Sequence, residues 1–378
     1  MPSFADFGLA LPILNALTTQ GYAEPTPIQA GAIPHVMLGR DLQGIAQTGT
    51  GKTAAFALPI LHRLWVDKKP APRRGCRALV LSPTRELASQ IAESFRAYGR
   101  QTGLRTALMY GGVPKGRQAK AVSGGIDILV ATPGRLLDHM GDGAVSLNGV
   151  EVLVLDEADH MLDLGFIVPI RKIAQSIPPA RQTLFFSATM PKEIAALARQ
   201  MLRDPAHVAV NPVATTAERV EQKVIFVEAS RKRQVLAGLL RSSKMTRTLV
   251  FTRTKHGADR VTQYLEAAGQ PAAAIHGDKT QPQRERALQM FKQGRVGVLV
   301  ATDVAARGID VEGVTHVVNF DLPNVPEAYV HRIGRTARAG QAGVAISFCD
   351  SSERAHLRGI EKLIRTRLSV EEPRGLAA

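Results

Sequence analysis

The segment that most constrains the fold is Ala46-Gln47-Thr48-Gly49-Thr50-Gly51-Lys52-Thr53. It follows a short apolar run, Leu42–Ala46, and precedes an alanine-rich helical pattern. This order is typical of a strand, a glycine loop and a helix, in which successive backbone N–H groups point inward and cradle phosphates. We therefore predict a nucleotide site with Lys52 at the β- and γ-phosphates and the Thr53 hydroxyl on Mg²⁺. The predicted phosphate-binding residues are Thr48, Gly49, Thr50, Gly51, Lys52 and Thr53.

A second apolar strand, Val152–Leu155, runs directly into Asp156-Glu157-Ala158-Asp159. A carboxylate at the end of a strand is the second half of a phosphate-loop site, so Asp156 is predicted to hold Mg²⁺. Glu157 is placed to orient and deprotonate the attacking water. The alternative is an acidic cluster that caps a helix.

Short apolar runs alternate with longer helical patterns along the whole chain, which predicts an α/β fold with parallel sheets covered by helices. The predicted strands of the first half are Leu42–Ala46, Ala78–Leu81, Ile126–Ala131, Val150–Leu155 and Thr183–Phe186. Those of the second half are Val224–Val227, Thr248–Phe251, Ala272–Ile275, Val296–Ala301, His316–Asn319 and Ala345–Phe348.

The two halves repeat each other. Leu79–Ser82 is similar to Leu249–Thr252, and Leu129–Thr132 is similar to Leu299–Thr302, both at an offset of 170 residues (249 − 79 and 299 − 129). Each match ends in a hydroxyl residue at the carboxyl end of a strand, where open α/β sheets bind ligands. The same offset moves the glycine loop onto Arg219–Lys223, which contains no glycine. We expect a duplicated domain in which only the first copy holds phosphates.

The domain limits follow from composition. We expect a first domain at 1–210, a linker at 211–219 with a hinge at Asn211–Ala217, a second domain at 220–368, and a frayed tail at 369–378. The linker segment is short, polar and uncharged, and Pro212 interrupts regular structure.

The net charge of +15 indicates a polyanionic partner, and nucleic acid is the commonest. An arginine-rich bias of the whole proteome is the alternative.

Cys76 and Cys349 lie far apart without a metal-binding pattern, so two buried thiols in a reducing cytoplasm are expected. The N-terminus lacks the pattern of a signal peptide, and no apolar run approaches the ~20 residues of a membrane helix.

Residues 156–159 spell DEAD, and the chain resembles the DEAD-box ATP-dependent RNA helicases from about Phe4 to about Phe348. The phrases at 251–258 and 322–327 look most like the bacterial RhlE-type branch. The resemblance implies two RecA-like domains joined by a flexible hinge, with ATP and Mg²⁺ as cofactors.

The resemblance also implies further residues of the ATP site. Gly21–Gln29 is similar to the family's Q motif, in which Tyr22 lies and the Gln29 amide reads adenine. Phe4 matches an aromatic that stacks on the base, and Phe7 is the rival. From the second domain the family supplies Gly308 and Asp310, and the arginine fingers Arg335 and Arg338. These two arginines are three apart and are expected on one helical face. The family usually has glycine where this chain has Ala337, a change expected to cost little.

Strand-end loops match the family's RNA contacts, which suit backbone phosphates and 2′-hydroxyls. The implied RNA-binding residues are Pro83, Thr84, Arg85, Gly111, Gly112, Thr132, Pro133, Gly134, Arg135, Thr252, Arg253, Arg284, Thr302 and Asp303. Residues matching motifs that couple ATP to RNA are Asp159, Ser187, Ala188, Thr189, His331 and Arg332. For a single loop, an ordinary turn or helix cap is the alternative.

The implied function is RNA-stimulated ATP hydrolysis, coupled to closure of the two domains, to gripping of the RNA backbone with little sequence specificity, and to local unwinding. Two alternatives stay open: an ATP-gated RNA clamp or scaffold that seldom unwinds, and a DNA translocase of the same superfamily. A monomer is the default expectation. Protein partners in ribosome assembly or RNA decay are not specified by the sequence.

Overall fold

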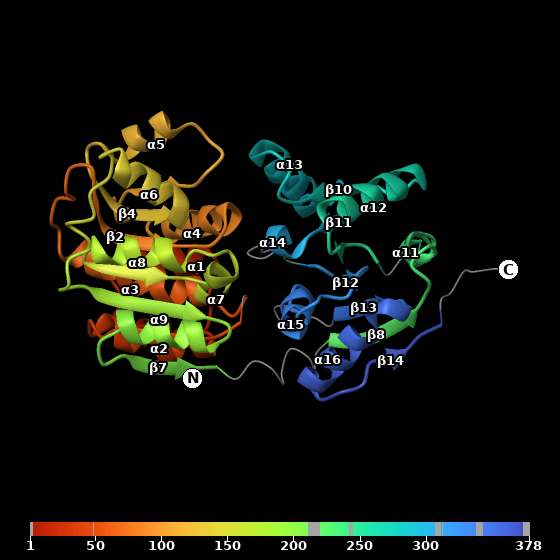
Figure 1. Cartoon of the computed structure of the whole chain (residues 1–378). Helices are drawn as coiled ribbons and strands as arrows, with labels where there is room; N and C mark the ends of the chain where they lie inside the picture. The colour runs from red at the N-terminus through yellow and green to blue at the C-terminus, as the bar shows by residue number, and fades with distance from the viewer. Residues whose placement is uncertain are drawn as a thin grey trace. The chain divides into compact units, whose positions relative to one another are not determined.

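The computed structural model describes residues 3–47, 49–210, 220–241, 245–306, 311, 313–337 and 343–372, with only the backbone of 304 and 306. The chain divides into two compact units, Met1–Val210 and Asn211–Ala378, each built around its own sheet. Figure 1 shows both ribbons. The predicted linker at 211–219, with its hinge, lies outside the described residues.

Unit 1 contains a seven-stranded sheet in the order β3-β4-β2-β5-β6-β1-β7, and all of its pairings are parallel. Its strands are β1 (Leu42–Ile45), β2 (Cys76–Leu81), β3 (Thr106–Met109), β4 (Ile126–Ala131), β5 (Val152–Leu155), β6 (Gln182–Ser187) and β7 (Ala206–Ala209). Because parallel strands need crossover connections, helices cover both faces of this sheet.

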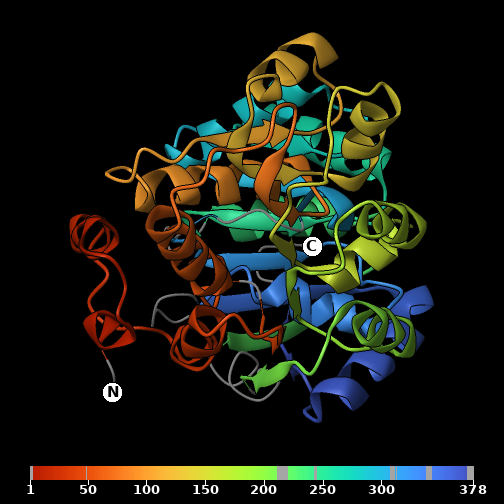
Figure 2. The ribbon, with the colours of Figure 1, turned by 90° about the vertical axis from the view of Figure 1, so that its left-hand side faces the viewer.

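Successive strand residues in unit 1 alternate between two apolar cores. Val152 and Val154 of β5 face the core under α1 to α4, whereas Leu153 and Leu155 face the core under α5 to α9. The helices are η1 (Phe4–Phe7), α1 (Leu11–Thr19), α2 (Pro27–Met37), α3 (Lys52–Val66), α4 (Arg85–Tyr98), α5 (Lys115–Val122), α6 (Pro133–Gly141), α7 (Ala158–Asp163), α8 (Ile167–Gln175) and α9 (Lys192–Met201). Figure 2 shows the N-terminal η1 and α1 at the margin of this unit.

Unit 2 repeats the plan with the strand order β10-β11-β9-β12-β13-β8-β14, again parallel throughout. Its strands are β8 (Val220–Phe226), β9 (Thr248–Phe251), β10 (Ala272–Ile275), β11 (Val298–Ala301), β12 (His316–Asn319), β13 (Gly343–Cys349) and β14 (Ser369–Val370). Its helices are α11 (Lys232–Leu240), α12 (Lys255–Ala267), α13 (Gln281–Lys292), α14 (Asp303–Ala306), α15 (Pro326–Ile333), η2 (Ser351–Glu353) and α16 (Arg354–Ile364).

The predicted duplication is confirmed by strand position. The matched segments end β2 and β9, which are third in their sheets, and β4 and β11, which are second. The predicted counterpart of the glycine loop was wrong, because residues 220–223 lie inside β8. The loop that occupies the equivalent place is 227–231, which follows β8 as the glycine loop follows β1.

All eleven predicted strands are present, and three short strands were missed. β3, β7 and β14 are edge strands with partly exposed residues, so they lack the continuous apolarity that revealed the others. The last of these corrects the prediction of a frayed tail from 369. Ser369–Val370 pairs with β8, the Glu371 backbone N–H donates to Val224, and the Glu371 carboxylate lies 3.1 Å from Lys223 Nζ.

Among the described helices, none combines the length and the apolarity that crossing a membrane requires.

Candidate nucleotide and nucleic-acid site

The glycine loop of unit 1 joins β1 to the first turn of α3. Gly49 and Gly51 have φ angles of +84° and +94°, a left-handed conformation that favours glycine. The buried Lys52 donates from Nζ to the Ala46 carbonyl at 2.9 Å, and Thr50 Oγ1 donates to the Gln47 carbonyl at 2.7 Å. The lysine side chain therefore points back into the loop, where its ammonium group would face phosphates held by the loop N–H groups. Thr48 lies outside the described residues.

Gln29 of α2 packs directly on this loop. Its Oε1 accepts from the Thr26 backbone N–H at 2.9 Å, and its Nε2 donates to the Gly51 carbonyl at 3.1 Å. A Cβ on Gly51 would overlap this Nε2, so both φ and space require glycine there. Each amide atom makes one bond among the described residues, which leaves the amide one donor and one acceptor for a base.

The N-terminal aromatic residues form an edge-to-face cluster. The Phe4 ring centroid lies 6.2 Å from that of Phe7 and 6.1 Å from that of Tyr22, and the Tyr22 and Tyr98 hydroxyls are 2.7 Å apart. Phe4 is only 5% exposed, whereas Tyr22 is 37% exposed. In this structure Phe4 anchors the N-terminal segment on unit 1, and stacking on a base stays a prediction.

Asp156 follows β5 and is buried. Burial raises the pKa of its carboxyl to about 6, although the nearby Lys52 ammonium opposes the shift. An additional cation beside this carboxylate would relieve the cost of ionising it, which fits Mg²⁺. The described residues contain no group of three or more His, Cys, Asp or Glu side chains arranged around a metal. The ion would therefore depend on nucleotide oxygens and water as well.

Glu157 has a left-handed backbone, with φ +53° and ψ +54°, at the start of α7. Such a conformation costs a non-glycine residue on the order of 1–3 kcal/mol and is concentrated at functional sites. The buried Glu157 carboxylate lies 3.3 Å from Nδ1 of His160, one turn along α7. His160 was not predicted as a site residue, although its spacing of three from Glu157 on a helix was a usable signal.

Asp159 is bonded to the segment after β6. Its Oδ2 accepts from the Thr189 backbone N–H at 2.9 Å and from Thr189 Oγ1 at 2.8 Å. Its own backbone N–H donates to Ser187 Oγ at 3.2 Å, and that hydroxyl donates to the Thr189 carbonyl at 2.7 Å. The two hydroxyls, separated by Ala188, thus tie the acidic segment to the end of β6 within unit 1.

Gly112 and Arg85 are brought together although they are remote in sequence. Gly112 has a φ of +80°, and a Cβ there would overlap the Arg85 guanidinium, with Cζ at 2.7 Å. A Cβ on Gly111 would lie 3.3 Å from Arg85 Nη2. The paired glycines therefore provide the space in which this guanidinium lies, at the start of α4.

The other predicted loops of unit 1 begin helices. Thr84 Oγ1 accepts from the Leu87 N–H as the cap of α4, and Thr132 precedes Pro133 and Gly134 in the first turn of α6. Arg135 donates from Nη1 to the Val113 carbonyl at 2.8 Å and to Gln118 Oε1 at 3.1 Å. Gln118, which the sequence did not single out, donates from Nε2 to the Tyr110 carbonyl at 3.0 Å. Arg135 thus supports the segment of the glycine pair directly at Val113 and also through Gln118.

In unit 2, the predicted RNA residue Arg253 follows β9. Its backbone N–H donates to Asp321 Oδ2 at 2.9 Å, and its Nη2 donates to the Leu322 carbonyl at 3.2 Å and to Glu353 Oε1 at 2.7 Å. Thr252 is buried beside it, whereas Arg284 lies on α13 and Thr302 precedes α14.

Asp303 and Arg332 form a two-point ion pair, with Nε–Oδ1 at 2.6 Å and Nη2–Oδ2 at 2.8 Å. Arg332 is 1% exposed and also donates to Asn319 Oδ1 and to the Asp321 carbonyl. Both carboxylate oxygens of Asp303 are thus engaged by Arg332. This pair supports the loop after β11, and the RNA contact of Asp303 stays a prediction.

The expectation that Arg335 and Arg338 share a helical face was wrong in its premise. Helix α15 ends at Ile333, with Gly334 as its cap, so Arg335 lies in the following turn. Arg335 is 6% exposed, and its Nε donates to the His331 carbonyl at 3.3 Å. Arg338, Gly308 and Asp310 lie outside the described residues.

Ala337 has a φ of +56°, which corrects the expectation that a methyl group costs little there. The left-handed conformation costs an L-residue about 1–2 kcal/mol relative to glycine, partly offset by the greater entropy of unfolded glycine. We expect Ala337→Gly to stabilise the chain by about 0.5–1 kcal/mol. Urea unfolding checks this, with Ala355→Gly on α16 as the opposite control, expected to destabilise by about 1 kcal/mol. A destabilising Ala337→Gly change contradicts the argument.

Comparisons with known proteins follow the same division into units. Residues 26–197 match the model of the DEAD/DEAH box helicase family, and residues 231–340 match the helicase conserved C-terminal domain. The chain is 44% identical over 368 residues to the DEAD-box ATP-dependent RNA helicase CshA of Bacillus cereus, which covers 97% of this chain and 69% of that one. It is 43% identical to CshA of Bacillus subtilis, covering 98% and 74%.

A solved structure of S. cerevisiae Dbp5 bound to RNA and ADP BeF3 matches with a TM-score of 0.87 and 30% identity, covering 99% of this chain and 96% of that one. A DEAD box protein from Methanococcus jannaschii matches with a TM-score of 0.55 and 38% identity, covering 98% and 99%.

Proposed function

The chain belongs to the DEAD-box ATP-dependent RNA helicases, and from this premise we propose how its residues divide the work of hydrolysing ATP and gripping RNA. The family assignment makes it an ATP hydrolase that acts on RNA, so neither the clamp nor the DNA translocase is needed to explain it.

Unit 1 binds ATP in this proposal. The loop N–H groups and Lys52 hold the phosphates, and Gln29 presents its remaining donor and acceptor to adenine. Phe4 or Phe7 stacks on the base. Thr53 and Asp156 would hold Mg²⁺, which supplies charge neutralisation at the phosphates.

Glu157 orients the attacking water and accepts its proton, with its backbone strain fixing the position of the carboxylate. Arg335 and Arg338 of unit 2 offset charge that develops on the transferred phosphoryl group. Gly308 and Asp310 contact the nucleotide from the same unit. The residues proposed to contact ATP, and those proposed to contact RNA, are divided between the two units. ATP and RNA therefore each favour a closed state, and binding of one strengthens binding of the other.

The single observation that carries the coupling is the bonding of Asp159 to Ser187 and Thr189. It makes the acidic segment beside the phosphates and the segment after β6 one hydrogen-bonded unit. A displacement of the Asp156–Asp159 backbone would therefore be passed to Thr189 through these hydrogen bonds.

Steady-state ATP hydrolysis with and without single-stranded RNA tests the proposal. We expect strong stimulation by RNA, weak stimulation by DNA of the same sequence, and a steep loss of RNA affinity with salt. Equal hydrolysis with and without RNA would overturn the coupling between the two ligands.

Gly112→Ala is expected to weaken RNA binding. The added Cβ displaces the Arg85 guanidinium, and the loss of one charged hydrogen bond to phosphate is worth about tenfold in affinity. The RNA concentration that gives half-maximal ATP hydrolysis should rise by about this factor, while the KM for ATP is unchanged. Gly103→Ala is the matched control, because Gly103 has a similar φ of +74° and a Cβ there meets no atom within 4 Å. Equal effects of both changes would contradict the role of Gly112.

Finer assignments complete the proposal. The RhlE-type branch rests on the phrases at 251–258 and 322–327, whereas the relatives named above are called CshA. The domain limits 1–210 and 220–368 remain proposed functional limits. A cytoplasmic location is proposed from Cys76 and Cys349, which are both free and buried. We also propose that the chain is a monomer and that its protein partners belong to ribosome assembly or RNA decay.

A further inference from the structure

The second unit contains a lysine in the place that Lys52 occupies in the first. β8 lies between β13 and β14 as β1 lies between β6 and β7, and α11 begins at Lys232 as α3 begins at Lys52. The intervening loop, Val227-Glu228-Ala229-Ser230-Arg231, has no glycine. Lys232 is therefore the positional counterpart of the phosphate-binding lysine, on a loop that lacks the glycines a phosphate cradle needs.

Lys232 is enclosed by carboxylates. Its side chain is 2% exposed, and Nζ lies 2.6 Å from Glu353 Oε2, 3.0 Å from Asp350 Oδ2 and 3.8 Å from Asp321 Oδ1. The same ammonium group lies 5.9 Å from the centre of the Phe320 ring. These acidic groups already neutralise the charge that would attract a phosphate.

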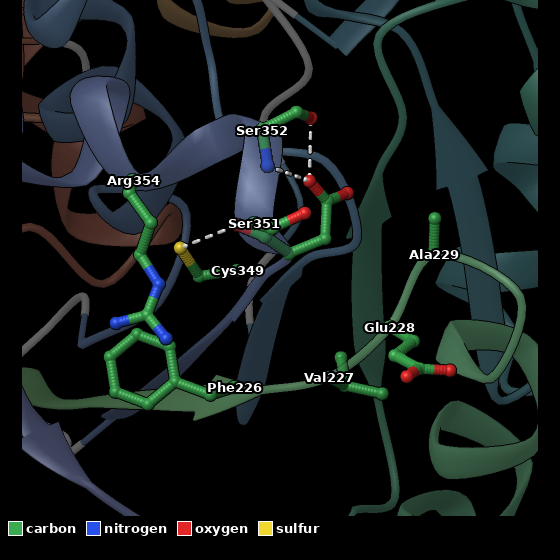
Figure 3. Close-up of a pocket in the computed structure, with 9 residues that line it drawn as sticks. Phe226, Val227, Glu228, Ala229, Cys349, Ser351, Ser352 and Arg354 are labelled. Atoms are coloured by element: carbon green, nitrogen blue, oxygen red, sulfur yellow. Dashed lines mark hydrogen bonds between the residues drawn. The ribbon is translucent and has the colours of Figure 1, made fainter.

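The hollow beside this loop is lined mainly by Phe226–Ala229 and Cys349–Ser352, with Arg354 (Figure 3). The Arg354 guanidinium lies 3.8 Å from the centre of the Phe226 ring, and Asp350 Oδ1 accepts from both the backbone N–H and the hydroxyl of Ser352. Glu228 and Asp350 bring negative charge to the lining, so the hollow does not suit a polyphosphate.

Glu353 connects Lys232 to Arg253. It is buried, and its Oε2 accepts from Lys232 Nζ at 2.6 Å and from the Asp350 N–H at 3.3 Å. Its Oε1 accepts from Arg253 Nη2 at 2.7 Å and from the Leu322 N–H at 3.0 Å. The Arg253 side chain is 39% exposed, so its guanidinium is held on the Glu353 side while part of it stays open to solvent.

We infer that Lys232 and Glu353 are positioning residues that fix the Arg253 guanidinium for RNA, and that the second unit's counterpart of the phosphate lysine now serves RNA binding. The inference rests on the proposed RNA contact of Arg253. Lys232 neutralises Glu353, and Glu353 orients Arg253. A freely rotating arginine side chain loses conformational entropy when it binds a phosphate. An arginine already held by Glu353 has lost that entropy on folding, so its binding to a phosphate is more favourable.

The test is the double variant Lys232→Met/Glu353→Gln, which removes the buried ammonium and the buried Glu353 carboxylate together. Asp350 loses its contact with Lys232 but keeps the two hydrogen bonds that Ser352 donates to it. We expect the RNA concentration for half-maximal ATP hydrolysis to rise about tenfold, as for one lost charged hydrogen bond. The KM for ATP and kcat at saturating RNA should stay within about threefold of the parent. In an Arg253→Ala chain the same double change should have no further effect on the RNA concentration.

The matched control is Lys223→Met/Glu371→Gln, which removes another ion pair of unit 2, between β8 and the residue that follows β14. This control should leave the RNA concentration for half-maximal ATP hydrolysis unchanged. Two results would overturn the inference. In the first, the Lys232/Glu353 change and Arg253→Ala have fully additive effects on the RNA concentration for half-maximal ATP hydrolysis, which indicates a general structural role. In the second, the Lys232/Glu353 variant is folded, as urea unfolding shows, and this RNA concentration is unchanged.

Failure of the proposed RNA contact gives a different result. Arg253→Ala by itself would then leave the RNA concentration unchanged. The positioning of Arg253 is measured separately by NMR hydrogen exchange of its guanidinium in the RNA-free protein. We expect exchange about tenfold faster in the Lys232→Met/Glu353→Gln variant. Unchanged exchange overturns the positioning role whether or not Arg253 binds RNA.

Discussion

Replacing Glu157 by glutamine is expected to reduce RNA-stimulated ATP hydrolysis by about 10²- to 10⁴-fold, the contribution of a positioned general base. Glutamine keeps the size of the side chain and tolerates the same backbone, but its amide does not accept the proton of the attacking water. The phosphate contacts of Lys52 and the glycine loop are unaffected, so ATP binding should be retained. Single-turnover hydrolysis and equilibrium binding of ATP measure the two quantities separately.

The control is Glu193→Gln, at an exposed position in the first turn of α9, which should hydrolyse ATP at the parent rate. A Glu157→Gln chain that retains a third or more of the parent rate would remove Glu157 from the role of base. A chain that loses ATP binding as well would show that the left-handed segment mainly supports the phosphate site.

Arg335→Ala is expected to lower kcat by about 10³-fold or more, the usual contribution of an arginine finger. Arg335 lies in the turn after α15, and its Nε donates to the His331 carbonyl, which fixes the direction of the guanidinium. Arg335→Lys should restore little, because an ammonium group does not reproduce the planar fork of the guanidinium. The kcat at saturating ATP and RNA is the quantity to measure.

Because Arg335 is buried, urea unfolding of the variant must accompany the kinetics. Arg358→Ala, on an exposed face of α16, is the matched control and should leave kcat unchanged. A folded Arg335→Ala chain with kcat within tenfold of the parent would assign Arg335 to the structure of the turn rather than to hydrolysis.

The sequence by itself determined the fold class, the duplication and the position of the phosphate loop. These depend on local signals: apolar runs of strand length, two glycines before Lys52, and carboxylates directly after a strand. Each such signal needs only neighbouring residues, so no knowledge of packing was required. The edge strands β3, β7 and β14 carried no such signal, because each is short and includes a polar residue, whereas the edge strand β10 was predicted from its continuous apolar sequence.

Only the tertiary structure decided which polar side chains engage each other. Asp303 is paired with Arg332, Glu353 holds Lys232 and Arg253 together, and Gly112 makes room for Arg85. These partners are separated by tens of residues or more, and a sheet brings them together only where the carboxyl ends of its parallel strands meet. Backbone angles were equally hidden: the left-handed conformations of Glu157 and Ala337 arise from the turns that hold them, since neither residue favours that region by itself.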